Sequence, residues 1–368
     1  MRFPGFEGEW ESFALGQLCE EFQSGKGIKS DQIKDLGSYP VYGGNGLRGY
    51  TDSYNHEGVY TLIGRQGAKC GNVRLVSGRT YITEHAVAVK ANQANVTEFL
   101  NWLFIKMDLG QYSDQSAQPG LAVNKLVRLN AFVPKKEEQK RIADLMTLID
   151  ARIAIQNKVI EKYESLIKAI TDKIVDDLLK ESIVSFCQMY KKAGEGGTPS
   201  TSVDMYYTNG SIPFIKIDDL SSKYLVNNKD YINELGLSKS SAWLIPSNSV
   251  IYSNGATIGA ISINTYPVST KQGILGVVPA TGVNTEYLYY LMNSRYFKEQ
   301  VQRIVTEGTM KTAYLKDMNK IPCPLPTPKA QLRIVTGLSV LSSRLEIEKS
   351  ALISYESIKM YLLRNLFI

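Results

Sequence analysis

The chain has 368 residues, of which 43% are hydrophobic and 21% are charged, which is typical of a water-soluble protein with two ordinary domains. Its 42 Lys and Arg residues against 36 Asp and Glu residues give a net charge of +6, which permits a nucleic-acid partner without requiring one. No apolar run approaches the roughly 20 residues that span a membrane, and the first residues lack the apolar stretch of a secretory signal.

Residues 1–134 predict a mixed α+β globule with many loops. Short β-type runs occur at 58–63 and 85–89, and the turn-forming stretch Gly43–Gly46 precedes them. A helix is expected over Thr97–Met107.

Residues 135–182 predict one long helix that follows Pro134 and contains no proline. Its apolar positions alternate in steps of four and three, which is the 3.5-residue period of a coiled-coil seam. The seam positions are Ile142, Met146, Ile149, Ile153, Gln156, Ile160, Tyr163, Ile167, Ile170 and Ile174.

Residues 183–326 return to the α+β pattern, and residues 327–368 again predict a long helix. The second globule has β-type runs at 249–252 and 274–278, a turn at Asn209-Gly210 and a helix expected over Thr285–Arg303. The seam positions of the second helix are Ile334, Leu338, Leu341, Leu345, Glu348, Leu352, Tyr355, Lys359, Leu362 and Leu366.

The two halves form a tandem duplication. The stretch at Gly67–Gly71 matches Gly255–Gly259 at an offset of 188 residues. Further along, the offset becomes 192, so that Pro134 falls on Pro326 and Gln139 on Gln331. Matches in the same order over both halves indicate one repeated unit of globule followed by helix.

Two arrangements could bury the seams. In the favoured one, the two helices pair with each other in an antiparallel coiled coil with pseudo-two-fold symmetry. Gln156 and Glu348 would then be diagonal neighbours near the middle that fix the register. In the alternative, each helix packs separately on its own globule.

Motifs of the common enzymes are missing from the sequence. There is no phosphate-binding GxxxxGK[ST], no GxGxxG after a strand, no HExxH, no GxSxG and no Asn-Pro-Pro-aromatic segment. The only histidines are His56 and His85, and His85 is expected to be structural or to contact a ligand. Cys19, Cys70, Cys187 and Cys323 are far apart in the sequence, which argues against disulfides or structural zinc and predicts a cytoplasmic location. We therefore expect no catalysis and no metal site in this chain.

These features together resemble the specificity subunit of type I restriction–modification enzymes, known as HsdS. The resemblance covers nearly the whole chain, and its most specific element is the phrase that opens each long helix. The local matches are Arg2–Phe6 with Trp10, Tyr42–Gly46, Ile63–Arg65, Gly197–Ser200, Ile212–Ile215, and Pro134, Glu138, Gln139, Arg141 and Ile142 with their echo at Pro326, Gln331, Arg333 and Ile334. The second copy departs from the first in having Ala330 at the position of Glu138 and no equivalent of Trp10.

The resemblance implies a non-catalytic DNA-recognition subunit of a complex that combines a restriction endonuclease with an adenine methyltransferase. The two globules would be target-recognition domains, each reading one half of a bipartite, asymmetric site in double-stranded DNA. The paired helices would set the spacing and dock two methyltransferase subunits, with restriction–translocase subunits joining them. S-adenosylmethionine, ATP and Mg²⁺ would be bound by those partners, and no cofactor by this chain.

Loop residues with amide, guanidinium, ammonium or hydroxyl groups are the candidates for DNA contact, since these groups bind base edges and phosphates. They are Asn45, Arg48, Tyr50, Arg65, Gln66 and Lys69 in the first globule, and Thr198, Ser200, Lys216, Ser253, Asn254, Lys271, Gln272 and Lys311 in the second. Each could instead be a solvated loop residue. Two other classes of function stay open: a coiled-coil scaffold that joins two domains for non-DNA ligands, and a self-sufficient DNA-modifying enzyme.

Overall fold

The computed structural model describes residues 2–67, 69–114, 120–305 and 311–367. The chain forms two compact units, the first comprising Met1–Lys158 with Lys349–Ile368 and the second Val159–Glu348. Each unit thus contains one globule and a part of both long helices. The units therefore divide the chain differently from the four predicted segments 1–134, 135–182, 183–326 and 327–368.

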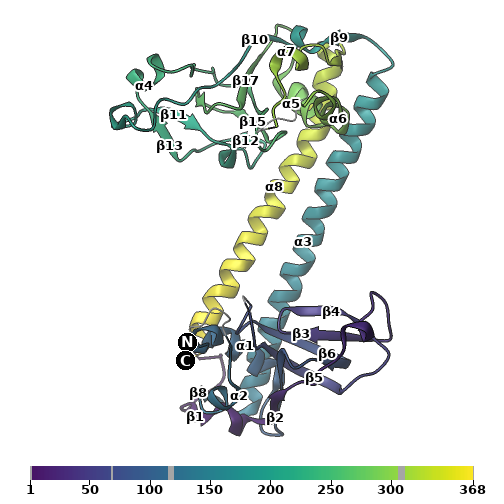
Figure 1. Cartoon of the computed structure of the whole chain (residues 1–368), viewed down its shortest axis with the longest axis vertical. Coiled ribbons are helices and arrows are strands. Elements are labelled where there is room, and N and C mark those ends of the chain that lie inside the picture. Colours follow the sequence, from purple (N-terminus) through teal and green to yellow (C-terminus); the bar gives the residue numbers. More distant parts are fainter. Residues whose placement is uncertain (1, 68, 115–119, 306–310, 368) are drawn as a thin grey trace. The chain divides into compact units, whose positions relative to one another are not determined.

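The first unit is built on a six-stranded sheet in the order β2-β7-β5-β6-β3-β4 (Figure 1). Its strands are β2 (Cys19–Ser24), β3 (Tyr39–Gly43), β4 (Gly46–Thr51), β5 (His56–Gly64), β6 (Val73–Ile82) and β7 (Ala86–Ala91). All neighbours pair antiparallel except β3 and β6. A separate pair joins β1 (Glu11–Ala14) to β8 (Asn130–Val133), and α2 (Val123–Leu126) precedes β8.

The core of this unit lies between the sheet and α1 (Thr97–Met107), which has the predicted bounds. Apolar side chains of α1, among them Phe99 and Leu103, pack with Ile63 of β5 and Val87 of β7. The C-terminal end of the chain joins the same core, where Phe367 stacks on Phe99 with ring centroids 5.4 Å apart.

The second unit contains a five-stranded sheet in the order β10-β17-β14-β15-β12 and a three-stranded sheet in the order β13-β11-β16. The strands of these sheets are β10 (Tyr190–Glu195), β11 (Ile212–Ile215), β12 (Tyr224–Leu225), β13 (Asp230–Ile232), β14 (Val250–Ser253), β15 (Ile261–Asn264), β16 (Ser269–Thr270) and β17 (Ile274–Pro279). The strands β9 (Ile183–Ser185) and β18 (Pro322–Pro324) form a separate pair. The short helices α4 (Glu234–Ser238) and α7 (Leu315–Met318) lie in connections.

The helix expected over Thr285–Arg303 is two helices, α5 (Thr285–Asn293) and α6 (Arg295–Ile304). Ser294 separates them because its backbone is extended and its Oγ accepts a hydrogen bond from the Phe297 N–H at 3.3 Å. A serine in this position caps the second helix.

The duplication is visible in the strand order. The series β2-β7-β5-β6 of the first unit has its counterpart in β10-β17-β14-β15 of the second, and each series is continued by a parallel strand, β3 or β12. The pairs β1–β8 and β9–β18 likewise correspond. The second repeat differs by its additional three-stranded sheet.

The two long helices are α3 (Lys136–Leu178) and α8 (Pro328–Asn365). Every predicted seam position is buried or half-buried, whereas Leu148 and Ile347, which lie off the seam, are 68% and 57% exposed. The periodicity therefore identified the covered face. The helix α3 ends four residues before the predicted position 182, because the chain turns there into β9.

Within the first unit, α3 and α8 pair antiparallel. The Lys359 ammonium lies 2.6 Å from the Asp150 carboxylate, and the Arg152 Nε donates to the Tyr355 hydroxyl at 3.2 Å. A later residue of α3 thus meets an earlier residue of α8, as the favoured arrangement predicts. The helices also pack on the globules, since Ile142 and Leu363 belong to the first core.

The two polar seam residues are buried, with Gln156 3% and Glu348 9% exposed. Glu348 binds Arg344 of the preceding helical turn at 2.6 Å. Their proposed role in setting the register stays a prediction.

Candidate nucleic-acid interface

In the first unit, the β3–β4 turn packs against the end of β5. A Cβ atom on Gly44 would lie 2.6 Å from the His85 carbonyl oxygen, and one on Gly64 would lie 2.5 Å from the Gly44 oxygen. Both contacts are too short for any side chain. Glycine at these positions therefore allows the turn at Asn45 to lie beside the segment that follows β5.

This packing gathers five of the six candidates into one group, which we call the first loop cluster: Asn45, Arg48, Arg65, Gln66 and Lys69. Among them, Asn45, Arg48 and Lys69 are exposed, and their side chains form no hydrogen bond with the described residues. A cluster of free cationic and amide groups beside a glycine-rich turn is suited to phosphates and base edges.

Two members of the cluster are partly held by the fold. The Arg65 guanidinium is half-buried and donates to the Ser24 Oγ at 3.1 Å and to the Leu121 carbonyl at 3.3 Å. Gln66 lies 3.0 Å from the His85 Nδ1 through its Oε1. These hydrogen bonds fix the position of the Arg65 guanidinium, and only its exposed part is available to a ligand.

Tyr50 lies elsewhere. It pairs with Pro40 at the end of the β3–β4 hairpin away from the turn, and its backbone bonds that of Lys34. Its half-buried side chain is not part of the first loop cluster.

At this edge, Arg74 escaped the sequence reasoning, whereas His85 was expected to be structural or to contact a ligand. Arg74 is exposed, and its Nη2 lies 3.3 Å from the Cβ position of Gly46, while His85 contacts Gln66. Arg74 reaches the turn because β6 pairs with β5 through Leu62 and Arg74. Its position directly after Gly71-Asn72-Val73 was the only signal in the sequence.

In the second unit, backbone hydrogen bonds bring three loops together. The Lys271 N–H donates to the Ile215 carbonyl, next to Lys216, and the Gly197 N–H donates to the Thr270 carbonyl, both at 3.0 Å. Gly255 bonds Gly273 and bridges to Thr312, which adds the segment of Lys311. We call the exposed side chains of these loops the second loop cluster: Thr198, Lys216, Lys271, Gln272 and Lys311.

Within this cluster, the Lys216 ammonium pairs with the Asp230 carboxylate at 2.8 Å. The remaining candidates are also engaged within the protein. Ser253 and Asn254 are 0% exposed, and the Ser253 Oγ donates to the Gly255 carbonyl at 3.0 Å. The Asn254 amide donates to Glu195 at 2.5 Å and to the Ala313 carbonyl at 3.1 Å. These two side chains hold the loop in shape and do not face a ligand. Ser200 is exposed and shares a hydrogen bond with Ser202 at 2.8 Å.

The side chains of the two loop clusters carry amide, guanidinium, ammonium and hydroxyl groups. Burial raises the pKa of the Cys19 thiol to about 12, so it stays protonated and unreactive. Among the described residues, no group of three or more His, Cys, Asp or Glu side chains is arranged to hold a metal ion. No helix formed by these residues has the length and apolarity needed to cross a membrane.

The sequence of this chain is similar to those of known specificity subunits. The curated relative "Type I restriction enzyme EcoprrI specificity subunit" of Escherichia coli is 36% identical over 176 residues. That alignment covers 47% of this chain and 40% of the relative, so the chain spans less than half the length of this relative in the match.

Two solved structures share the fold across the chain. The S subunit of a type I restriction–modification system from M. genitalium superimposes with a TM-score of 0.69 and 16% identity, covering 100% of this chain and 99% of that one. A chain from a study of complex assembly and conformational transition of the type I R-M system gives a TM-score of 0.60 at 13% identity, covering 98% of both chains. The family model "Type I restriction modification DNA specificity domain" matches twice, at residues 7–165 and 183–355. The chain therefore belongs to the family of type I restriction–modification DNA specificity domains.

Proposed function

We propose that this chain is the DNA-recognition subunit of a type I restriction–modification complex, in which each globule reads one half of a bipartite, asymmetric target. The observation that carries the proposal is a repeated fold with different side chains at equivalent loop positions. The exposed Lys69 of the first repeat corresponds to the exposed Thr257 of the second, at the offset of 188 residues. Two domains that share one backbone fold but expose different polar side chains are suited to two half-sites of different sequence.

The long helices would set the distance between the half-sites and dock two methyltransferase subunits. Their outward faces support a docking role, since large apolar residues there are left uncovered by the chain itself. Those that are more than half exposed are Leu148 and Ile155 on α3, and Leu332, Val340, Ile347, Ile353 and Tyr361 on α8. Restriction–translocase subunits would join this assembly, and S-adenosylmethionine, ATP and Mg²⁺ would be bound by the partners, which carry out catalysis.

The recognition function is tested by the methylation pattern of cells that carry this gene together with its methyltransferase. The expected motif has two specified parts separated by a gap of unspecified bases. Exchanging residues 183–326 for those of another specificity subunit should change one part and leave the other intact. A single uninterrupted motif, or methylation by the purified chain alone, would contradict the proposal.

The spacing function is tested by removing one matched heptad from both helices. A heptad is roughly 10 Å of helix, or about 3 base pairs of DNA. We expect the gap between the half-sites to change or DNA binding to be lost. An active variant that keeps the original gap would refute the spacing role.

A further inference from the structure

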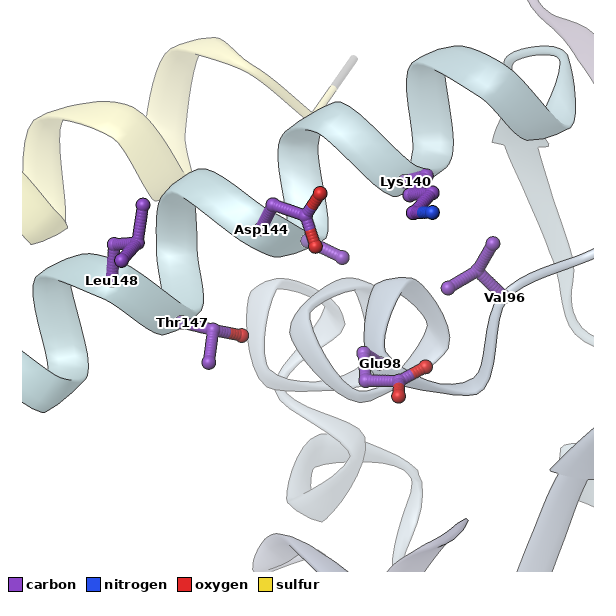
Figure 2. A pocket seen from close by; sticks show the side chains of 7 residues that line it. Val96, Glu98, Lys140, Asp144, Thr147 and Leu148 are labelled. Carbon is purple, nitrogen blue, oxygen red and sulfur yellow. The ribbon is translucent and has the colours of Figure 1, made fainter.

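An open groove runs between α1 and the first part of α3 in the first unit. It has a volume of about 520 Å³ and is lined by Val96, Glu98, Lys140, Ala143, Asp144, Thr147 and Leu148. Figure 2 shows Glu98 on α1, and Lys140, Asp144 and Thr147 along α3 above it. The Glu98 carboxylate is half-buried and has no ion pair or hydrogen bond with any other described residue.

At the equivalent position of the second repeat, between α5 and α8, side chains of the chain itself contact the corresponding glutamate. Glu98 corresponds to Glu286 at the offset of 188, and Thr147 corresponds to Ser339 at the offset of 192. The ammonium group of Lys223 binds the Glu286 carboxylate directly and lies 3.0 Å from the Tyr290 hydroxyl. The Ser339 Oγ also donates to Glu286, at 2.6 Å.

The neighbour of this lysine completes the arrangement. The Tyr224 hydroxyl donates to the second oxygen of Glu286 at 2.7 Å, and the Lys223 ammonium lies 5.0 Å from the centre of the Tyr224 ring. The Lys223 side chain is 11% exposed and that of Glu286 26%. A lysine followed by an aromatic residue therefore provides hydrogen-bond donors to both carboxylate oxygens of Glu286.

In the first repeat, the counterpart of β12 is β3, which pairs at a different place and brings no such pair of residues to Glu98. Tyr224 is the first residue of β12 and pairs with Ile263 of β15, and Lys223 directly precedes this strand. The counterpart of Ile263 is Leu75 on β6, whereas β3 pairs with β6 only further on, at Tyr81 and Ile82. Leu75 is 36% exposed.

The nearby lysines of the first unit do not replace Lys223. Lys359 is engaged with Asp150 at 2.6 Å and lies over the Trp102 ring at 5.1 Å. Lys140 is exposed and has no ion pair with a described residue. With Glu98 and Asp144 against Lys140, the groove keeps an excess of negative charge, which favours a cationic ligand.

We propose that the groove of Glu98 receives a lysine followed by an aromatic residue from a protein partner, in the place that Lys223 and Tyr224 fill in the second repeat. The partner is a methyltransferase subunit, so this inference rests on the proposed function. The two repeats then differ as binding sites for this partner, because in the second repeat the site is already occupied by Lys223 and Tyr224 of the chain itself.

Zero-length carbodiimide cross-linking tests the proposed contact at Glu98. The reagent joins a carboxylate to a lysine amine in direct contact through an amide bond, and it takes up the released water to become a urea. In the full chain with its bound methyltransferase subunit, peptide mapping by mass spectrometry should find Glu98 joined to a partner lysine that precedes an aromatic residue. The internal amide between Glu286 and Lys223 is the positive control. Glu98 joined only to Lys140, or not joined at all while the control forms, would overturn the inference.

The variant Glu98→Gln tests the energetic role. We expect about tenfold weaker binding of the methyltransferase subunit, which is the size of one charge-assisted hydrogen bond. Glu161→Gln, an exposed glutamate of α3 outside the groove, is the matched control and should leave the affinity unchanged. Circular dichroism of both variants checks that the fold is kept. Equal affinities of Glu98→Gln and wild type for the methyltransferase subunit would contradict the proposed binding role of Glu98.

A synthetic peptide separates this inference from the proposed function. The peptide Ser-Lys-Tyr-Leu-Val, which copies residues 222–226, should cross-link to Glu98 of the full chain at millimolar concentration and compete with the partner. If the chain binds no methyltransferase but the peptide labels Glu98, the proposed docking is wrong, while binding of a lysine followed by an aromatic residue in the groove of Glu98 is still supported. If the methyltransferase binds and neither it nor the peptide reaches Glu98, only the further inference fails.

Discussion

Gln139, at the start of α3, accepts a hydrogen bond from the Val96 backbone N–H at 3.0 Å through its side-chain oxygen. Its amide nitrogen donates to the Pro134 carbonyl at 2.9 Å. Gln331 repeats the arrangement in α8, accepting from the Asn284 N–H at 2.7 Å and donating to the Pro326 carbonyl at 2.9 Å. The glutamine of each helix-opening phrase thus ties the long helix to the residue that precedes α1 or α5.

Replacing Gln139 by leucine should destabilise the first unit. The glutamine is 1% exposed, and the variant removes the partners that it gives to the half-buried Val96 N–H and to the buried Pro134 carbonyl. The expected loss is about 2–3 kcal/mol, measured by urea denaturation. Gln93→Leu, at an exposed loop position, is the control and should change stability by less than about 0.5 kcal/mol. A loss in Gln139→Leu no larger than that of the control would show that these hydrogen bonds add little.

Removing the Lys223 charge should lower stability over a defined pH range. Burial by itself would lower the pKa of Lys223, but the hydrogen bonds to Glu286 and Tyr290 outweigh it and raise the pKa above 10.5. Burial would raise the pKa of Glu286, and the hydrogen bond from Lys223 brings it below 4.5. The lysine stabilises the fold at pH values below about 10, and the glutamate does so above about 4.5.

We therefore expect Lys223→Met to lose about 1.5–3 kcal/mol at pH 7, the range for hydrogen bonds to charged groups. The difference from wild type should be constant between about pH 5 and pH 10. It should shrink as the pH falls below 4.5 and through the lowered pKa of Glu286, because Glu286 becomes protonated in both proteins once that pKa is passed. Denaturation at a series of pH values measures this, and a difference that persists unchanged at pH 3 would contradict the assignment. Lys229→Met, an exposed lysine, is the control.

Lys359 is a charged residue at a seam position, and its contacts explain how the seam accepts it. Its ammonium reaches Asp150 of α3 and lies over the Trp102 ring, while the lysine side chain is 27% and the Asp150 side chain 45% exposed. A double-mutant cycle with Lys359→Ala and Asp150→Ala should give a coupling of about 0.5–1 kcal/mol, as expected for a partly exposed pair. The coupling should decrease in 1 M salt, and its absence at low salt would contradict the contact.

Arg48 and Arg74 should contribute to DNA affinity without strongly changing which sequence is bound. Both are exposed at the β3–β4 turn and free of ion pairs with described residues. If each neutralises a phosphate, Arg48→Ala or Arg74→Ala reduces the slope of log affinity against log salt by about 1. Fluorescence anisotropy in the presence of the methyltransferase measures the slope. Lys106→Ala, exposed at the end of α1, should leave it unchanged.

The loop candidates show where sequence reasoning reached its limit. The stretch around Gly67 and its copy around Gly255 lie next to the two loop clusters, and the glycines indicated close packing. Yet Ser253 and Asn254 are buried while Arg74 is exposed at the turn. Burial in these loops depends on bridges such as Gly255 to Thr312, whose partners are distant in the sequence.

The sequence by itself determined the duplication, the family and the buried face of both long helices. A helix places residues three and four apart on one side through local geometry, so Ile142, Ile160 and Leu338 could be assigned from spacing alone. The tertiary structure decided which loop side chains face outward, that Lys223 contacts Glu286, and that the groove of Glu98 stays open. Those outcomes depend on strand pairings such as β12 with β15, which join residues that no local period connects.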